Sequence, residues 1–305
     1  MNVPPPGTRP FRVRWLGRVR YRDALALQRA IHAHGADDHL LLLEHHPVYT
    51  LGVRASIENL LAPPEEVGAD LEQADRGGDI TFHGPGQLVG YPLLYLPGKR
   101  GGRMADTVAY VRSVEDLIIE VCADLGLDDV GRLNRHPGVW VEPGGPHPRK
   151  LAAIGVRLSR ARTMHGFALN VDPDLSFFDR MVPCGIADYG VTSLAVEGVT
   201  ATMAEVVERI VERAVARWAH GPVERADVSW PEQALNLGQS GHRSEGNGAV
   251  ELERKPEWMR VRLDTGPGYR RLKSMMRERQ LVTGCEEAGC PNIFECWNDG
   301  TATFM

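Results

Sequence analysis

The segment from Lys150 to Cys184 constrains the fold of this chain more than any other stretch. Two apolar runs follow Lys150, joined by a short arginine-rich turn, and the second run carries His165, Gly166 and Asn170. Apolar runs separated by such a turn predict a β-hairpin. The chain beyond the hairpin can return Cys184 towards Lys150, which would bring a thiol close to an amine.

A thiol beside an amine has a chemical use. The thiolate is the nucleophilic form of cysteine, and a neighbouring cation lowers the thiol pKa from its usual value of about 8.5. A desolvated lysine can also take up and return the proton. Most cysteines, however, are small buried apolar residues. The Pro-Cys-Gly turn alone therefore leaves both a reactive and a packing role open for Cys184.

Length and composition narrow the class of protein. A chain of 305 residues suits one large domain or two modest ones. It has no apolar run of about 18 residues that could span a membrane, and its N-terminus lacks the apolar core of a signal peptide. We therefore expect a cytoplasmic protein, in which five cysteines serve as thiols or metal ligands rather than disulfides. A pI near 6.1 disfavours a dedicated nucleic-acid binder.

Hydrophobic spacing predicts helices over residues 22–34, 104–125 and 202–218. The last of these begins with a capping box, Thr202 followed by Glu205. Cys122 falls within the second helix and is interpreted as a packing residue. Apolar runs predict a buried strand before the turn at residues 46–47, a second over LVGYPLLYL, and shorter strands near residues 130–134 and 138–142. His45 and His46 have no third partner at metal-ligand spacing, so we interpret them as structural or pocket-lining.

Residues 9–22 contain six arginines. The alternation over residues 12–15 predicts a strand with one solvated face. An alternative is a docking surface for an acidic protein partner, which such charge would attract.

The run RGGDITFHGPGQ, residues 76–87, brackets a short strand with glycines. Glycine lets the backbone approach a ligand closely and leaves N–H groups free for an acyl carbonyl or a phosphate. An ordinary glycine-rich hairpin would have the same composition. The run lacks the Gly-Lys-Ser/Thr of a phosphate-binding loop and precedes no helix, so nucleotide binding is disfavoured.

A second module follows a Gly- and Ser-rich stretch, residues 236–250, that is typical of a flexible linker. A helix is predicted near residues 268–280, and Cys285, Cys290 and Cys296 come after it. This density of cysteines in a cytoplasmic chain indicates metal or iron–sulfur ligation. Only Cys122 and Cys184 remain elsewhere, so a complete four-cysteine site is not available.

Several motifs together resemble the lipoyl(octanoyl) transferase family over roughly residues 10–220. They are YRDALALQ, EHHPVYTLG, RGGDITFHGPGQ, the lysine of RKLAAIG, HGFALN and the cysteine of PCGIADYGVTSL. The resemblance implies an α/β (α+β) fold, a mixed sheet flanked by helices like that of biotin and lipoate protein ligases. It also implies transfer of an octanoyl group from acyl carrier protein to a lysine of a lipoyl domain through a cysteine thioester, in lipoate biosynthesis.

The resemblance implies roles for individual residues. Cys184 would carry the acyl group and Lys150 would lower the thiol pKa. The acyl-binding stretches of the family correspond to Arg76, Gly77, Gly78, Asp79, Ile80, Thr81, Phe82, His83, Ala153, Ile154, Gly155, Gly166, Phe167 and Ala168. Acyl transfer would need no cofactor. The acceptors would be the lipoyl domains of 2-oxo acid dehydrogenase complexes and the H protein of glycine cleavage, and the enzyme would act as a monomer without nucleic acid or membrane.

KPEWMRVRL, the three spaced cysteines and GTATFM resemble the N-terminal part of lipoyl synthase. We therefore expect an octanoyltransferase domain over residues 1–222, a linker over 223–253 and a partial lipoyl synthase segment over 254–305. The chain stops before the Cys-x3-Cys-x2-Cys that would hold the radical-generating cluster. Cys285, Cys290 and Cys296 would then form an incomplete iron–sulfur site with a labile cluster. Both a natural truncated fusion and an incomplete gene fit this pattern.

Two other functions are weighed against acyl transfer. A lipoate or biotin ligase would adenylate a free acid with ATP and would have no use for Cys184. An iron–sulfur carrier or scaffold would depend on the C-terminal cysteines and would use the large domain only to bind partners. A test for ATP dependence distinguishes the ligase from the acyltransferase. Loss of activity on deletion of residues 236–305 would favour the iron–sulfur carrier or scaffold.

Overall fold

The computed structural model describes residues 9–96, 106–134, 136–181, 189–228 and 274. The chain divides into two units, Met1–Gln239 and Ser240–Met305, and only Ser274 of the second is described. The predicted helix near 268–280 and the cysteines 285, 290 and 296 thus lie outside the described residues, apart from Ser274. Cys184 lies outside them as well. Within the described part, no helix is long and apolar enough to cross a membrane.

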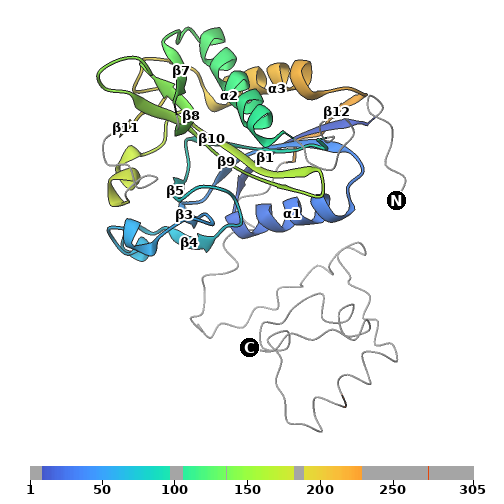
Figure 1. The fold of residues 1–305 in the computed structure, drawn as a ribbon, viewed down its shortest axis with the longest axis horizontal. Coiled ribbons are helices and arrows are strands. Elements are labelled where there is room, and N and C mark those ends of the chain that lie inside the picture. The colour runs from blue at the N-terminus through green and yellow to red at the C-terminus, as the bar shows by residue number, and fades with distance from the viewer. Residues whose placement is uncertain (1–8, 97–105, 135, 182–188, 229–273, 275–305) are drawn as a thin grey trace, which may run out of the picture. The chain divides into compact units, whose positions relative to one another are not determined.

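A mixed sheet forms the centre of the first unit (Figure 1). Its strands lie in the spatial order β12 (Val223–Arg225), β1 (Phe11–Val19), β2 (Asp38–His45), β6 (Gln87–Leu93), β10 (Arg162–Asn170), β9 (Arg149–Ser159), β8 (His136–Val141) and β7 (Val130–Leu133), and β11 (Gly190–Val191) pairs with β9. The first three strands are parallel to one another, β11 is parallel to β9, and the other pairs are antiparallel. The predicted mixed sheet is therefore confirmed.

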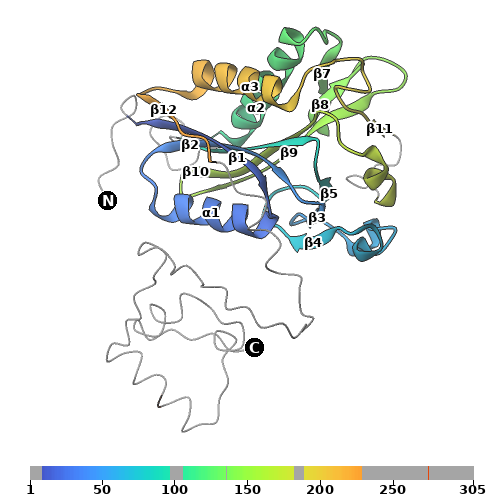
Figure 2. The same ribbon diagram turned by 180° about the vertical axis from the view of Figure 1, so that it is seen from behind.

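Helices cover both faces of this sheet (Figures 1 and 2). α1 (Tyr21–His34) packs on one face, and α2 (Thr107–Asp124) and α3 (Met203–Trp218) pack on the other. The four leucines of β2 show why both faces are closed. Leu40 and Leu42 belong to the core beneath α2 and α3, and Leu41 and Leu43 belong to the core beneath α1. Successive side chains of a strand point to opposite faces, so an unbroken apolar run requires cover on both.

The local signals in the sequence act as expected. At the start of α3, the Thr202 side chain accepts a hydrogen bond from the Glu205 N–H, and the Glu205 carboxylate accepts one from the Thr202 N–H at 2.8 Å. The predicted capping box is thus confirmed, and such a cap stabilises a helix by about 1 kcal/mol. Cys122 is fully buried in the core beneath α2, and burial raises the pKa of its thiol to about 12. Its predicted packing role is confirmed.

A second, smaller sheet lies beside the main one and consists of β4 (Asp70–Gln73), β3 (Val48–Leu51) and β5 (Ile80–His83). Among the described residues, the short 3-10 helices η2 (Pro64–Val67) and η4 (Leu175–Arg180) contact this sheet, and η1 (Ile57–Asn59) lies between β3 and η2 in the sequence. Tyr49, Phe82 and Phe178 form the centre of its apolar core. This small sheet places the glycine-rich run of residues 76–79 against the edge of the hairpin β9–β10, because Gly77 N–H donates to the Val156 carbonyl at 3.0 Å.

The arginine-rich segment forms β1 and the entry to α1, and several of its arginines contact other parts of the first unit. Arg12 pairs with Asp37 at 2.6 Å and with Glu224 at 2.5 Å. The Arg9 guanidinium lies 3.8 Å from the centre of the Tyr95 ring, and Arg22 pairs with Glu72. These contacts favour a structural role for the segment over a docking surface for an acidic partner.

Candidate active site

The predicted hairpin is confirmed as β9 and β10, and a tight turn joins its strands. Arg160 and Ala161 form this turn with φ of +51° and +60°. Positive φ at both central residues is the hallmark of a type I′ turn, whose twist matches the twist of paired strands. The pairing runs without interruption from Arg162 opposite Ser159 to Leu169 opposite Ala152. It places Gly166 of β10 opposite Gly155 of β9.

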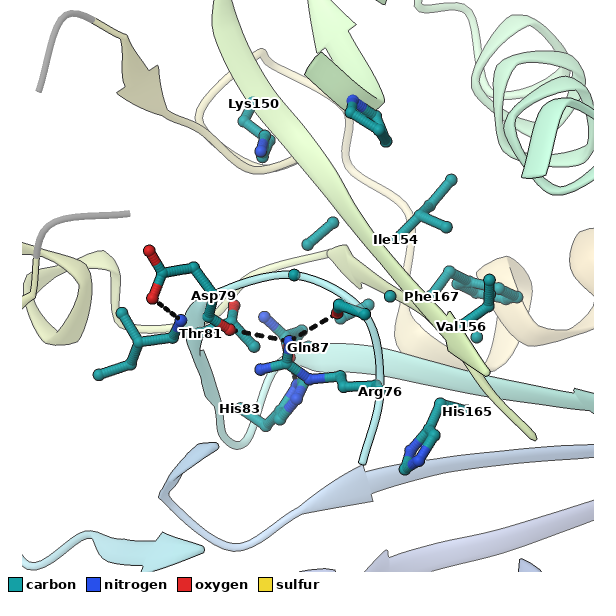
Figure 3. Close-up of a pocket in the computed structure, with 18 of the residues that line it drawn as sticks. Arg76, Asp79, Thr81, His83, Gln87, Lys150, Ile154, Val156, His165 and Phe167 are labelled. Atoms are coloured by element: carbon teal, nitrogen blue, oxygen red, sulfur yellow. Dashed lines mark hydrogen bonds between the residues drawn. The ribbon is translucent and has the colours of Figure 1, made fainter. Parts of the chain in front are cut away.

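A cavity of about 520 Å³ opens between this hairpin and the small sheet (Figure 3). Lys150 lines this cavity. Thirteen of the fourteen residues expected to bind the acyl group also line it, namely Arg76, Gly77, Gly78, Asp79, Ile80, Thr81, His83, Ala153, Ile154, Gly155, Gly166, Phe167 and Ala168. Segments that lie some seventy to ninety residues apart in the sequence therefore share one concave site, as small-molecule sites commonly do.

Phe82 is the exception among these fourteen residues. Its ring stacks on Phe177 with centres 4.4 Å apart and meets Phe178 edge-on at 5.6 Å. Phe82 therefore belongs to the core of the small sheet and not to the cavity lining. Thr81 and His83, whose side chains leave the opposite face of β5, line the cavity, whereas Ile80 on the same face as Phe82 belongs to both the cavity lining and the small-sheet core.

The glycine-rich run is held in shape by Arg76. This buried guanidinium donates to the Thr50 carbonyl and hydroxyl oxygens, each at 2.7 Å, and to the Asp79 carbonyl at 2.9 Å. Gly78 has φ of +95°, a backbone conformation that side chains with a Cβ rarely adopt. These hydrogen bonds brace the cavity wall, and the expected contact of Arg76 with the acyl group stays a prediction.

Lys150 lies at one end of the cavity (Figure 3). Its ammonium is 4.7 Å from the centre of the Trp140 ring, an arrangement in which the ring face attracts the cation. Tyr189 packs edge-on against Trp140 and His136 at 5.3 and 5.5 Å. A Cβ built on Gly138 would lie 3.6 Å from the Lys150 Cε and only 2.5 Å from the Ala152 carbonyl oxygen. The absence of a side chain at Gly138 thus allows β8 to approach β9 closely. Because the same point lies near both the Lys150 Cε and the Ala152 carbonyl, the end of the Lys150 side chain lies at the level of Ala152 along β9.

The segments on both sides of Cys184 also enter this cavity. Met181 and Val191 line it together with Lys150. Val191 of β11 is the register partner of Lys150, and the Thr192 N–H donates to the Lys150 carbonyl. The predicted return of the chain towards Lys150 is therefore present at the described residues that flank Cys184.

A hydrogen-bonded ion pair holds the same strand pair. Arg149 donates to both carboxylate oxygens of Glu197, at 2.9 and 3.0 Å, and to Glu142 at 3.0 Å. The hydrogen bonds that Arg149 donates to Glu197 raise the pKa of Arg149 and hold the pKa of Glu197 below its usual value. Thr192 donates its hydroxyl to Glu197 at 2.6 Å. The carboxylate thereby links the start of β9 to the residue after β11.

A chain of polar side chains crosses the floor of the cavity. Asn170 donates to the Thr192 carbonyl at 2.8 Å, Gln87 donates to the Asn170 Oδ1 at 2.9 Å, and Gln87 Oε1 lies 2.7 Å from His83 Nδ1. The Thr192 carbonyl can only accept, so Asn170 must donate its amide NH2 to it and present Oδ1 to Gln87. Gln87 then donates its own NH2 to Asn170 and presents Oε1 to His83, so His83 must donate from Nδ1. Burial, above all, holds the pKa of His83 well below its usual value. The ring is therefore neutral and keeps Nε2 as an acceptor.

His165 occupies the opposite end of the cavity from Lys150 (Figure 3). Its φ of +58° is rare for a residue other than glycine, and its N–H donates to Gln28 of α1 at 2.8 Å. Its Nε2 lies 2.7 Å from Asp75, which also pairs with Arg157. Burial, which outweighs the bond to Asp75, lowers the pKa of His165.

The sequence did not reveal part of the lining, namely Tyr21, Gln87, Tyr91 and His136. It also did not reveal that Gly138 lies beside Lys150. His165 and Asn170 were noticed on the second strand of the hairpin without a role. One available signal was the presence of polar or aromatic hydroxyl groups within strands that are otherwise apolar, because a buried polar group must find a partner. Among the described residues, no group of three or more His, Cys, Asp or Glu side chains could hold a metal ion.

Known proteins share both the sequence and the fold. The family model described as the lipoyl protein ligase A/B catalytic domain matches residues 20–214, and the model for the N-terminal domain of lipoyl synthase of the radical SAM family matches residues 229–290. The second match confirms the predicted resemblance and begins inside the segment expected to be a linker. The expected domain boundaries stay a prediction.

The most similar relatives include an octanoyltransferase of Mycolicibacterium gilvum (strain PYR-GCK), 50% identical over 68% of this chain and 84% of its own length. An octanoyltransferase of Mycobacterium tuberculosis (strain ATCC 25177 / H37Ra) is 52% identical over 64% of this chain and 81% of its own length.

Solved structures of low sequence identity share the fold. A lipoate-protein ligase A bound with ATP has a TM-score of 0.58 at 17% identity, over 74% of this chain and 92% of its own. A bipartite lipoate protein ligase of Thermoplasma acidophilum has a TM-score of 0.58 at 15% identity, over 74% and 90% of the two chains. The predicted lipoate ligase fold is thereby confirmed. On the strength of the matched catalytic domain and of relatives about 50% identical to it, the chain belongs to the lipoyl protein ligase A/B family, among the octanoyltransferases.

Proposed function

We propose that this chain transfers an octanoyl group from octanoyl-acyl carrier protein to a lysine of a lipoyl domain, through a thioester on Cys184. One observation carries the proposal. Met181 and Val191, which flank the segment of Cys184, line the same cavity as Lys150. Cys184 follows Met181 by three residues and precedes Val191 by seven. These short chain lengths favour a position of the thiol close to the cavity.

In the first step, the Cys184 thiol gives up its proton to Lys150, whose ammonium then stabilises the thiolate. The thiolate attacks the carbonyl carbon of the donor thioester, and the tetrahedral intermediate expels the thiol of the carrier, which regains the proton. One carbon–sulfur bond forms and one breaks, so this step is close to reversible and needs no ATP. A well-placed backbone N–H that binds the oxyanion would contribute roughly 3–4 kcal/mol.

In the second step, the amine of the acceptor lysine attacks the Cys184 thioester. An amide forms, the Cys184 sulfur leaves as thiolate, and the proton lost by the amine passes through Lys150 to this thiolate, which restores the thiol. Formation of the amide makes this step the irreversible one. The acyl chain lies along Ala153, Ile154 and Phe167 of the hairpin, and its burial contributes about 0.8 kcal/mol per methylene.

The substrates of the proposed reaction are acyl carrier protein carrying octanoate, and the lipoyl domains of 2-oxo acid dehydrogenase complexes and of the H protein of glycine cleavage. The enzyme acts in the cytoplasm as a monomer, and the transfer uses no cofactor. Cys285, Cys290 and Cys296 hold at most a labile iron–sulfur cluster that takes no part in the transfer.

A single experiment separates this reaction from that of a ligase. The purified chain is incubated with an apo lipoyl domain and either octanoyl-acyl carrier protein without ATP or free octanoate with ATP and Mg²⁺. Mass spectrometry then follows the lipoyl domain. Octanoylation with the carrier alone is expected, and modification only with octanoate and ATP would overturn the proposal in favour of the ligase reaction.

A further inference from the structure

We infer that the wall of the cavity farthest from Lys150 sets the upper limit on acyl chain length, because it is polar and an octanoyl chain ends directly before it. We call this far wall the set Tyr21, His83, Tyr91 and His165, all of which line the cavity. The inference rests on the proposed function and goes beyond it, since it names the residues that discriminate between acyl groups.

The distance along the hairpin matches an eight-carbon chain. The Lys150 side chain lies at the level of Ala152, and His165 lies opposite Val156. Four residues of strand separate these levels, which is about 13 Å. Seven carbon–carbon bonds of about 1.5 Å in a zigzag span about 9 Å, and contact of the carbonyl with the amine adds about 3 Å. The terminal methyl group of octanoate therefore lies near His165, and two further carbons would have to enter the far wall.

The far wall is one continuous cluster of rings. The ring of Tyr21 stacks on His83 with centres 6.4 Å apart, and both meet the ring of His45, at 5.4 and 5.6 Å. His45 continues to Tyr91 at 6.0 Å, and Tyr91 continues to His165 at 6.3 Å. The cluster consists of packed aromatic rings and contains no flexible aliphatic side chain that could change rotamer to admit a longer acyl chain.

The polar atoms of the far wall make the limit chemical as well as steric. The Tyr21 side chain is almost completely buried, and its hydroxyl has no hydrogen-bond partner among the described residues. His83 donates from Nδ1 to Gln87, so its Nε2 remains an acceptor. Tyr91 donates its hydroxyl to His45 Nε2 at 2.7 Å, because His45 Nδ1 donates to the Val19 carbonyl. Ordered water can satisfy the Tyr21 hydroxyl when octanoate is bound, whereas a longer hydrocarbon chain would displace this water and offer no hydrogen bond in exchange.

The test compares acyl carrier proteins charged with six-, eight-, ten- and twelve-carbon chains, with the full chain as enzyme and an apo lipoyl domain as acceptor. We expect kcat/KM to fall at least tenfold from octanoyl to decanoyl, equivalent to about 1.4 kcal/mol. The variant Tyr21→Phe removes the unpartnered hydroxyl and keeps the ring. In it, the ratio of decanoyl to octanoyl kcat/KM should rise about five- to tenfold.

The matched control is Tyr49→Phe, which removes a hydroxyl that donates to the Phe177 carbonyl at 2.8 Å and does not line the cavity. Its ratio should equal that of the wild type. The inference is overturned if folded Tyr21→Phe keeps the wild-type ratio, or if the wild type transfers decanoyl as well as octanoyl.

Calorimetric binding of free octanoate and decanoate tests the far wall independently of transfer. Octanoate should bind at least tenfold more tightly to the wild type, and Tyr21→Phe should narrow this difference. A chain that transfers no octanoyl group from any donor would overturn the proposed function, whereas equal affinities for the two acids would overturn the chain-length limit alone.

Discussion

The backbone N–H of Thr192 donates a hydrogen bond to the carbonyl oxygen of Lys150 across 3.0 Å. Val191, one residue earlier, is the register partner of Lys150, and Glu197 ties Arg149 to the Thr192 hydroxyl. The lysine and the chain that returns from the segment of Cys184 are therefore held by the same short strand pair. A change in the register of β11 would move both reacting groups relative to each other, which explains why so short a strand has an ion pair of its own.

Cys184 should carry the acyl group. Incubation with octanoyl-acyl carrier protein is expected to add one octanoyl mass to the peptide that contains Cys184, and Cys184→Ala should abolish both the label and the transfer. Peptide mass spectrometry is the measurement. The matched control is Cys122→Ala, because burial raises the pKa of the Cys122 thiol to about 12 and leaves it unreactive. A label on another residue, or full activity in Cys184→Ala, would falsify this role.

Lys150 should set the reactivity of the thiol. Lys150→Ala is expected to raise the pKa of Cys184 and to reduce turnover by a factor on the order of 10²–10⁴, the usual contribution of a general base. The pH dependence of iodoacetamide alkylation at Cys184 measures the pKa directly. Lys150→Arg provides the comparison, since it keeps the positive charge but cannot exchange the proton. It should restore the alkylation profile and leave turnover low; an unchanged profile in Lys150→Ala would leave Lys150 only a structural role.

Gly78→Val should reduce transfer because Gly78 lines the cavity with φ of +95°, where a β-branched residue is strained. We expect a loss of roughly 1–3 kcal/mol in the free energy of unfolding and a larger loss of activity than this strain explains. Chemical denaturation and initial rates give the two quantities. Gly198→Val is the matched control, because Gly198 has φ of +85° and a Cβ there would meet no atom within 4 Å. If both variants transfer octanoate at the wild-type rate, residues 76–79 serve only as a turn.

Stability should fall in mild acid because of buried neutral histidines. Burial lowers the pKa of His45 from 6.5 to about 4. Between these values the unfolded chain binds the proton and the folded chain does not, so this contribution is complete above pH 6.5 and is lost as the pH falls towards 4. The full loss is about 3 kcal/mol for this one group. His83 has a lowered pKa for the same reason and acts in the same direction.

The measurement is the free energy of unfolding in urea at several values between pH 7 and 4.5. In His45→Gln the dependence on pH should be shallower than in the wild type, by up to about 1.4 kcal/mol per pH unit. The exposed His34, changed in the same way, should leave the slope as it is. Equal slopes in the wild type and in His45→Gln would show that folding does not lower the pKa of His45.

The C-terminal segment should not insert sulfur. Lipoyl synthesis in the resembled family needs one cluster to cleave S-adenosylmethionine and another to donate sulfur, and this chain has five cysteines in all. After anaerobic reconstitution with iron and sulfide, we expect neither 5′-deoxyadenosine nor lipoyl product from an octanoylated lipoyl domain. Deletion of residues 236–305 should leave octanoyl transfer unchanged. Either product above background, or loss of transfer on deletion, would contradict this expectation.

Much of the architecture is already determined by local patterns in the sequence. The leucine run of β2 requires cover on both faces, the Thr202–Glu205 box begins α3, and the two apolar runs after Lys150 form β9 and β10. These features depend on neighbours within a few residues, whose hydrogen bonds and side-chain directions follow from the period of the element. The motifs that resemble the octanoyltransferases likewise identify about half of the residues that line the cavity, Lys150 among them.

Only the tertiary structure decided which distant residues meet. Asp75 reaches His165 across ninety positions, Tyr21 of α1 stacks on His83 of β5, and Gly138 makes room beside Lys150. The tertiary structure also places the Phe82 side chain in the core of the small sheet, although Thr81 and His83 on either side of it line the cavity. Such contacts depend on sheet register and on how two sheets pack against each other. A shift of one residue would exchange the buried and cavity-facing sides of a strand, and the partner strand that fixes this register lies far away in the sequence.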